Sequence, residues 1–212
     1  MENNHKAKQF WSWFTKNLEK LNQIDGLSEE SREAFLDDML DALQKYHPEL
    51  YFQVEGEPDE AMEFIITAEG EEEFFADAKA LVAQAPAIPG WDIIALKQPM
   101  MLLSDEAFEV EGLSIRPEQL HFIALKSEEN PEMMGIKIFF EDYAQVADKD
   151  LLEFGIFQML EILAGEEAMA LHVRLLNINP LPQEDMEEEL LPITELYDFI
   201  EWYKNDKGED SE

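Results

Sequence analysis

The sequence contains no cysteine and no long apolar run among its 212 residues. Without cysteine, a secreted disulfide scaffold is excluded, and so are thiol nucleophiles and thiolate metal ligands. No stretch reaches the roughly 18 apolar residues that a membrane-spanning helix needs. The N-terminus also lacks the apolar core of a signal peptide. We therefore expect a cytoplasmic protein that does not bind a membrane.

Basic residues are scarce, because 15 Lys and Arg stand against 49 Asp and Glu, a formal net charge of −34. A charge of this size repels phosphate backbones and anionic lipid heads, so we expect no nucleic-acid partner. It offers a strong field to a basic protein. The plainest interpretation is a well-solvated surface, and the sequence leaves both alternatives open.

Motifs for catalysis and cofactor binding are missing as well. The glycines are isolated in turns, so the dinucleotide and P-loop patterns are absent, and no serine lies in G-x-S-x-G or S-x-x-K. We assign no catalytic residue and expect no cofactor.

Histidines are few, and two of them, His121 and His172, alternate with apolar neighbours in expected strands. A metal site would require these two to meet with carboxylates. No ligand spacing supports such a site, so we expect no bound metal.

Hydrophobic residues make up 46% of the chain and include 14 Phe, which is enough for a core. Residues 1–48 are expected to form an N-terminal helical segment, with an amphipathic helix around Phe10–Leu21 and a second helix capped by Ser28. The Pro48 ring ends the second helix.

A β-β-α-β order follows twice along the chain. The first unit, residues 49–98, has expected strands at Leu50–Val54, Glu63–Thr67 and Trp91–Leu96, with a helix over Glu71–Gln84. After an irregular connection at 99–118, the second unit, 119–180, repeats this order with strands at His121–Leu125, Met134–Phe140 and Ala168–Ile178 and a helix over Asp148–Gly165. We predict an α+β fold in which two β-β-α-β pseudo-repeats share one mixed sheet in a single compact domain.

The helix of the second unit is apolar on most sides, which predicts burial on more than one side. It fits between the sheet and the N-terminal helices, or at a contact between subunits. The second placement would make the protein a homodimer. Residues 181–204 are expected to form a linker and a C-terminal helix, and 205–212 a disordered tail.

Interaction residues are drawn from one aromatic and two acidic clusters. Trp11 lies off the main apolar stripe of the first helix and is expected to be partly exposed, although aromatic stripes usually belong to cores. The acidic runs are more often solvated faces than sites. The candidates are Trp11, Glu71, Glu72, Glu73, Asp185, Glu187, Glu188 and Glu189.

Three segments together resemble an uncharacterised family of bacterial cytoplasmic proteins. These are Phe10–Phe14 (FWSWF), Phe64–Gly70 (FIITAEG) and Ala85–Leu96 (APAIPGWDIIAL). The resemblance covers nearly the whole length and implies a bacterial source, without implying an activity or any site residue.

Two functions follow from these observations. The first is a non-enzymatic binding or regulatory protein for a basic protein partner, of the immunity or charge-mimic type. The alternative is a hydrolase or other small-molecule enzyme that uses carboxylates in a cleft between the two units. An acidic face with an exposed aromatic anchor would favour the binding protein.

Overall fold

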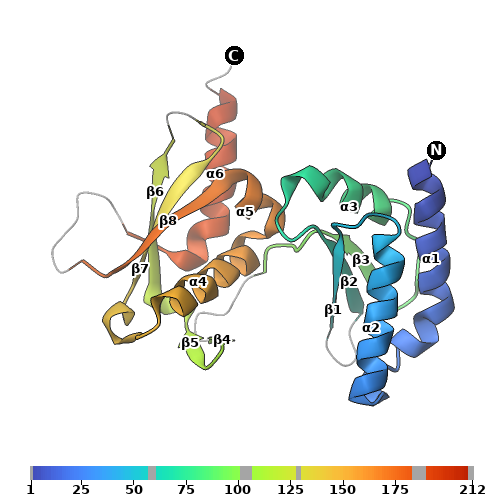
Figure 1. Cartoon of the computed structure of the whole chain (residues 1–212). Helices are drawn as coiled ribbons and strands as arrows, with labels where there is room; N and C mark the ends of the chain where they lie inside the picture. Colours follow the sequence, from blue (N-terminus) through green and yellow to red (C-terminus); the bar gives the residue numbers. More distant parts are fainter. Residues whose placement is uncertain (1, 57–60, 101–106, 128–129, 183–189, 210–212) are drawn as a thin grey trace. The chain divides into compact units, whose positions relative to one another are not determined.

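The structure is a computed structural model that describes residues 2–56, 61–100, 107–127, 130–182 and 190–209. The chain divides into two compact units, Met1–Lys97 and Gln98–Glu212, where the sequence analysis expected a single compact domain. Each unit combines helices with its own sheet, which confirms the predicted α+β class (Figure 1).

The first unit is a three-stranded sheet with helices packed on it (Figure 1). Its strand order is β1-β2-β3, with β1 antiparallel and β3 parallel to the central β2. Its elements are α1 (Glu2–Leu21), α2 (Glu29–Gln44), β1 (Tyr51–Glu55), β2 (Met62–Thr67), α3 (Phe75–Val82) and β3 (Trp91–Ala95).

Aromatic packing holds α1 against this sheet. The Phe14 ring lies 4.6 Å from the Phe64 ring of β2, and Phe10 lies 6.3 Å from the same ring. All three side chains are buried. The predicted N-cap of α2 is confirmed, because the Ser28 side chain accepts a hydrogen bond from the Ser31 backbone N–H.

The second unit contains a four-stranded sheet, a short hairpin and three helices (Figure 1). The sheet order is β8-β7-β6-β9, in which β7 is antiparallel to β6 and parallel to β8. The elements are β4 (Phe108–Val110), β5 (Leu113–Ile115), β6 (Leu120–Lys126), β7 (Met134–Phe140), α4 (Lys149–Ala164), α5 (Glu166–His172), β8 (Val173–Pro180), β9 (Leu191–Pro192) and α6 (Leu196–Glu209).

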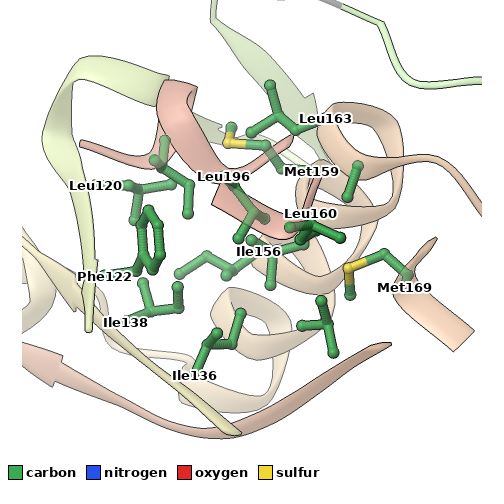
Figure 2. Close-up of a cluster of buried hydrophobic side chains, with 14 of the residues drawn as sticks. Leu120, Phe122, Ile136, Ile138, Ile156, Met159, Leu160, Leu163, Met169 and Leu196 are labelled. Carbon is green, nitrogen blue, oxygen red and sulfur yellow. The ribbon is translucent and has the colours of Figure 1, made fainter. Parts of the chain in front are cut away.

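The core of the second unit lies where one sheet face meets α4 and α6 (Figure 2). Alternate strand residues such as Phe122 and Ile138 lie on the sheet face that α4 covers. They belong to the same cluster as Ile156 and Leu160 of α4. Leu196 of α6 reaches the same cluster. A continuous apolar cluster of this size gives the second unit a core of its own.

The predicted shared sheet is wrong, because β1–β3 and β6–β9 form separate sheets. The pattern of apolar residues in a strand shows which of its faces is buried. It does not show which other strands it pairs with, so it cannot say whether two hairpins join the same sheet. Both units nevertheless have an antiparallel hairpin, a helical crossover and a third strand parallel to the second. That this recurrence reflects a duplicated unit is still a prediction.

Two element boundaries and one strand differ from the expectation. The predicted strand Ala168–Ile178 begins only at Val173, because α5 occupies Glu166–His172 after Gly165 turns the chain with φ of 80°. The α6 helix continues to Glu209, through residues predicted to form a disordered tail. The β5 strand falls in the segment expected to be an irregular connection and was not predicted.

Candidate binding groove

An open groove of about 630 Å³ runs along the second unit between α4 and β8. One wall comes from the helix and the other from the start of the strand. The lining residues are Asp150, Glu153, Phe154 and Phe157 of α4, and Val173, Arg174 and Leu175 of β8.

The helix wall follows from residue spacing on α4. Positions i, i+3, i+4 and i+7 of a helix share one face, which brings Asp150, Glu153, Phe154 and Phe157 together. Phe154 is 51% exposed and Phe157 is 47% exposed. Two neighbouring phenylalanines half open to solvent form an apolar surface without a cover in the described unit.

The start of α4 is held by polar contacts beside the groove. The Asp148 carboxylate caps the helix by accepting hydrogen bonds from the backbone N–H groups of Asp150 and Leu151, at 3.1 and 3.0 Å. The Lys149 ammonium donates to the Val146 carbonyl at 2.7 Å and also to the Tyr143 carbonyl. The groove wall is therefore fixed at its N-terminal end.

The strand wall lies at the edge of the sheet. Within the described residues, β8 pairs with β7 and with no other strand. A register irregularity beside Ile136 and Lys137 leaves Leu176 without a partner on β7. Leu176 is 46% exposed and lies over Gly135. A β-carbon added to Gly135 would be 2.7 Å from the Leu176 Cδ1 atom.

The charges in the groove are two carboxylates and one guanidinium. Among the described residues, the Asp150 and Glu153 side chains and the Arg174 guanidinium make no hydrogen bond or ion pair with one another or with other groups. The second unit, residues 98–212, carries 28 acidic residues against 7 basic ones, so the field around the groove is negative.

Trp11 is not an exposed interaction residue, which corrects the sequence-based expectation. It is only 4% exposed, and its indole N–H donates a hydrogen bond of 3.0 Å to the Leu81 carbonyl. Among the tryptophans that the structure describes, Trp202 on α6 does reach solvent, with 52% of its surface exposed. A helix stripe shows which residues can share a face, but the packing of the neighbouring α3 decided that Trp11 is covered.

The described acidic candidates are not among the residues that line the groove. Glu71, Glu72 and Glu73 are exposed and lie just before α3 in the first unit. The second acidic cluster, Asp185, Glu187, Glu188 and Glu189, lies outside the described residues.

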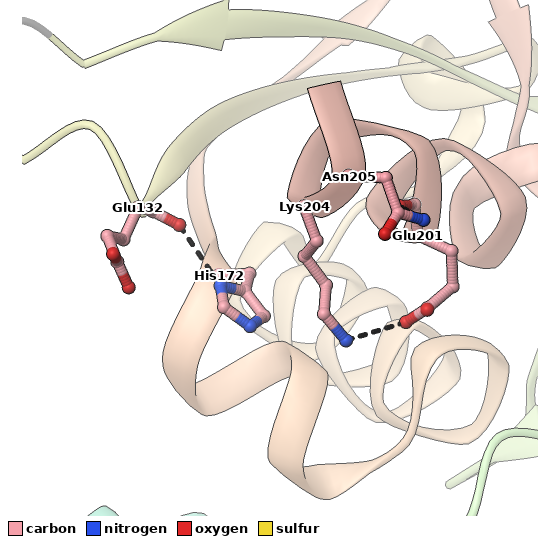
Figure 3. A network of polar contacts seen from close by, with 5 residues as sticks. All are labelled: Glu132, His172, Glu201, Lys204 and Asn205. Carbon is pink, nitrogen blue, oxygen red and sulfur yellow. Dashed lines mark hydrogen bonds and ion pairs between the residues drawn. The ribbon is translucent and has the colours of Figure 1, made fainter. Parts of the chain in front are cut away.

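The two strand histidines do not meet. His121 is level with Phe139 in the register of β6 and β7, whereas His172 precedes Val173, which is level with Met134 at the other end of the strand. Five residues of strand separate these levels, about 16 Å. The His172 Nδ1–H donates to the Glu132 carbonyl at 3.1 Å (Figure 3). Among the described residues, no group of three or more His, Asp or Glu side chains could hold a metal.

A tyrosine in the first unit has a perturbed pKa. Burial raises the pKa of Tyr46, and the nearby Asp77 carboxylate raises it further. The Tyr46 hydroxyl donates a hydrogen bond of 3.1 Å to the Asp77 backbone carbonyl, so it ties the turn after α2 to α3. This contact is structural and lies in the unit that does not contain the groove.

Sequence reasoning missed the phenylalanines and the arginine of the groove. The signal was present in the observation that the α4 sequence is apolar on most sides. Its core stripe includes Leu152, Ile156 and Leu160, so Phe154 and Phe157 fall outside that stripe. Whether such residues are covered depends on elements far away in the chain, here the β4–β5 hairpin and α6.

Comparisons of this chain with protein-family models, with curated proteins and with solved structures give no match. The resemblance to an uncharacterised bacterial family therefore remains an expectation. In the part of the chain that the structure describes, no helix is both long and apolar enough to cross a bilayer.

Proposed function

We propose that this chain is a non-enzymatic binding protein that uses the groove between α4 and β8 to hold a basic protein partner. The observation that carries the proposal is the pair Phe154 and Phe157, half exposed and side by side on one helix face above the groove. Exposed aromatic side chains in a recess are the usual anchors of protein interfaces.

The charges near these rings support a basic partner. Asp150 and Glu153 lie in the same groove, and neither has an ionic partner within the described residues. A lysine or arginine bound there would have its aliphatic stem over a phenylalanine ring and its charge near a carboxylate. The net charge of −34 would speed the encounter with such a partner at low salt.

A peptide selection tests the proposal and works with an unidentified partner. Random 12-residue peptides displayed on phage are selected on the immobilised full chain, and the enriched peptides are measured against variants. We expect an excess of Lys and Arg over Asp and Glu. The double variant Phe154→Ser/Phe157→Ser should weaken binding by about 10- to 100-fold, the loss typical of removing interface anchors.

The matched control is Trp202→Ser, which removes an exposed aromatic side chain that is not among the groove-lining residues. This variant should bind the selected peptides like the parent chain. The proposal is wrong if the enriched peptides have no basic excess, or if the double variant, melting like the parent, binds them equally well.

A further inference from the structure

The free edge of β8 forms one side of the groove, and this edge offers hydrogen-bonding groups as well as side chains. Successive residues of a strand direct their backbone N–H and C=O groups to opposite sides. Among the described residues only one side of β8 is paired, with β7. The other side can therefore accept a further strand, a common way to recognise extended peptides.

Resting on the proposed function, we propose that the partner segment binds as an added β-strand on β8, with basic and apolar residues in alternation. An added strand would lie about 4.8 Å from β8, in the groove beside α4. Every second side chain would face Phe154, Phe157 and the carboxylates, where long basic side chains fit. The intervening side chains would lie on the face that carries Leu176, where apolar groups fit.

A helical partner fits these observations less well. A helix satisfies its own backbone groups, so it would leave the free edge of β8 unused. The β8 edge carries few of the side chains that block strand addition, since Arg174 is its one charged residue and Pro180 lies at its end.

Arg174 favours one alignment of the added strand along β8 over others. Its guanidinium has no ion pair among the described residues, and it lines the groove beside Asp150 and Glu153. A basic side chain placed next to Arg174 is repelled, whereas one next to the carboxylates is attracted. Removing this charge should therefore strengthen the binding of a probe in which all charged residues are lysine.

A second copy of the chain is the less suitable occupant. Two copies would each bring a net charge of −34 to the contact, and like charges oppose association.

Two labelled 14-residue peptides test the strand mode on the full chain by fluorescence anisotropy. Both contain seven Leu and seven Lys, one in strict alternation and the other with helical spacing, so composition and charge are equal. We expect the alternating peptide to bind at least about tenfold more tightly, the effect of a few backbone hydrogen bonds. Equal binding, tighter binding of the helical pattern, or no binding of either peptide overturns the strand mode.

Backbone methylation makes the test sharper. Two forms of the alternating peptide carry N-methyl groups on either the odd or the even residues, and only one of these sets can point to β8. One form should lose about tenfold or more in affinity while the other stays within about threefold. Equal losses in both forms contradict an added strand.

Arg174→Gln, compared with Arg116→Gln, tests the register inference at equal net charge. Arg116 does not line the groove, and its nearest carboxylate partner, Glu118, is 4.0 Å away. Only Arg174→Gln should strengthen binding of the lysine probe, by about two- to fivefold for a screened charge pair. Equal gains in both variants contradict the role of Arg174. The proposed function is judged separately, by the dependence of selected peptides on Phe154 and Phe157.

Discussion

Gly155 of α4 and Val110 of β4 approach so closely that a β-carbon on Gly155 would lie 2.7 Å from Val110 Cγ1. The same β-carbon would be 3.0 Å from Ile115 Cδ1 on β5. The β4–β5 hairpin therefore packs on α4 through a position that must lack a side chain, and it leaves the helix face of Phe154 and Phe157 open.

Gly155→Ala should destabilise the second unit by up to about 2 kcal/mol. Overpacking costs roughly 1–3 kcal/mol and outweighs the roughly 1 kcal/mol that alanine gains inside a helix. Val110 is β-branched and cannot rotate away easily. Gly135→Ala is the matched comparison, since its close neighbour is the end of the half-exposed Leu176 side chain, which can move. The free energy of unfolding measured in urea should be lower for Gly155→Ala than for Gly135→Ala. The reverse order would contradict this packing.

Replacing Trp11 with Phe should lower the free energy of unfolding by about 1–3 kcal/mol. The change removes the hydrogen bond to the Leu81 carbonyl and leaves space in a buried site. Trp202→Phe, at a half-exposed position, should change stability by less than about 0.5 kcal/mol. Both values come from chemical denaturation followed by circular dichroism. Similar small effects for both variants would mean that Trp11 is accessible.

Stability should fall at alkaline pH partly through Tyr46. Its folded-state pKa is raised, by burial first and by Asp77 second, so the folded protein holds this proton more tightly than the unfolded chain. The contribution is fully present below the unfolded pKa of about 10 and is lost as pH rises through the folded pKa. Denaturation between about pH 9 and pH 11.5, the range around this pKa, should give a shallower decline for Tyr46→Phe than for the control Tyr197→Phe, at an exposed site. Parallel declines would refute the assignment.

Added salt should raise the melting temperature at pH 7. The Debye length falls from about 30 Å at 0.01 M to less than 10 Å above 0.1 M, so repulsion among the acidic residues is screened. A gain of about 1–2 kcal/mol corresponds to roughly 2–8 °C for a chain of this size. Thermal melts from low to high sodium chloride check this expectation. A flat or falling melting temperature would mean that the charges are already spread or paired in the fold.

The two units should fold when they are produced separately. Each has a sheet and a buried core of its own, and the division falls between Lys97 and Gln98. Fragments 1–97 and 98–212 should each show a cooperative thermal transition. The second fragment should depend more on salt, since it has 28 acidic against 7 basic residues, compared with 21 against 8 in the first. A fragment without a cooperative transition would mean that its core needs the other unit.

Local signals in the sequence were sufficient for most helices and strands. Ser28 followed by two acidic residues predicted the start of α2, and the strand expected at Met134–Phe140 has the bounds of β7 in the structure. These features depend on a few neighbouring residues, because capping and side-chain alternation are local properties of the backbone. The failure at Ala168–His172 has the same origin, since a short apolar run after a glycine suits a strand or a helix.

The sequence by itself determined the α+β class, the acidic charge and the positions of most strands. Only the tertiary structure decided that the strands form separate sheets, that Trp11 is buried, and that Phe154 and Phe157 are exposed beside the edge of β8. The physical reason is that coverage depends on partners distant in the chain. Leu81 lies 70 residues from Trp11 and accepts its indole N–H, whereas the described second unit leaves Phe154 and Phe157 half exposed on α4.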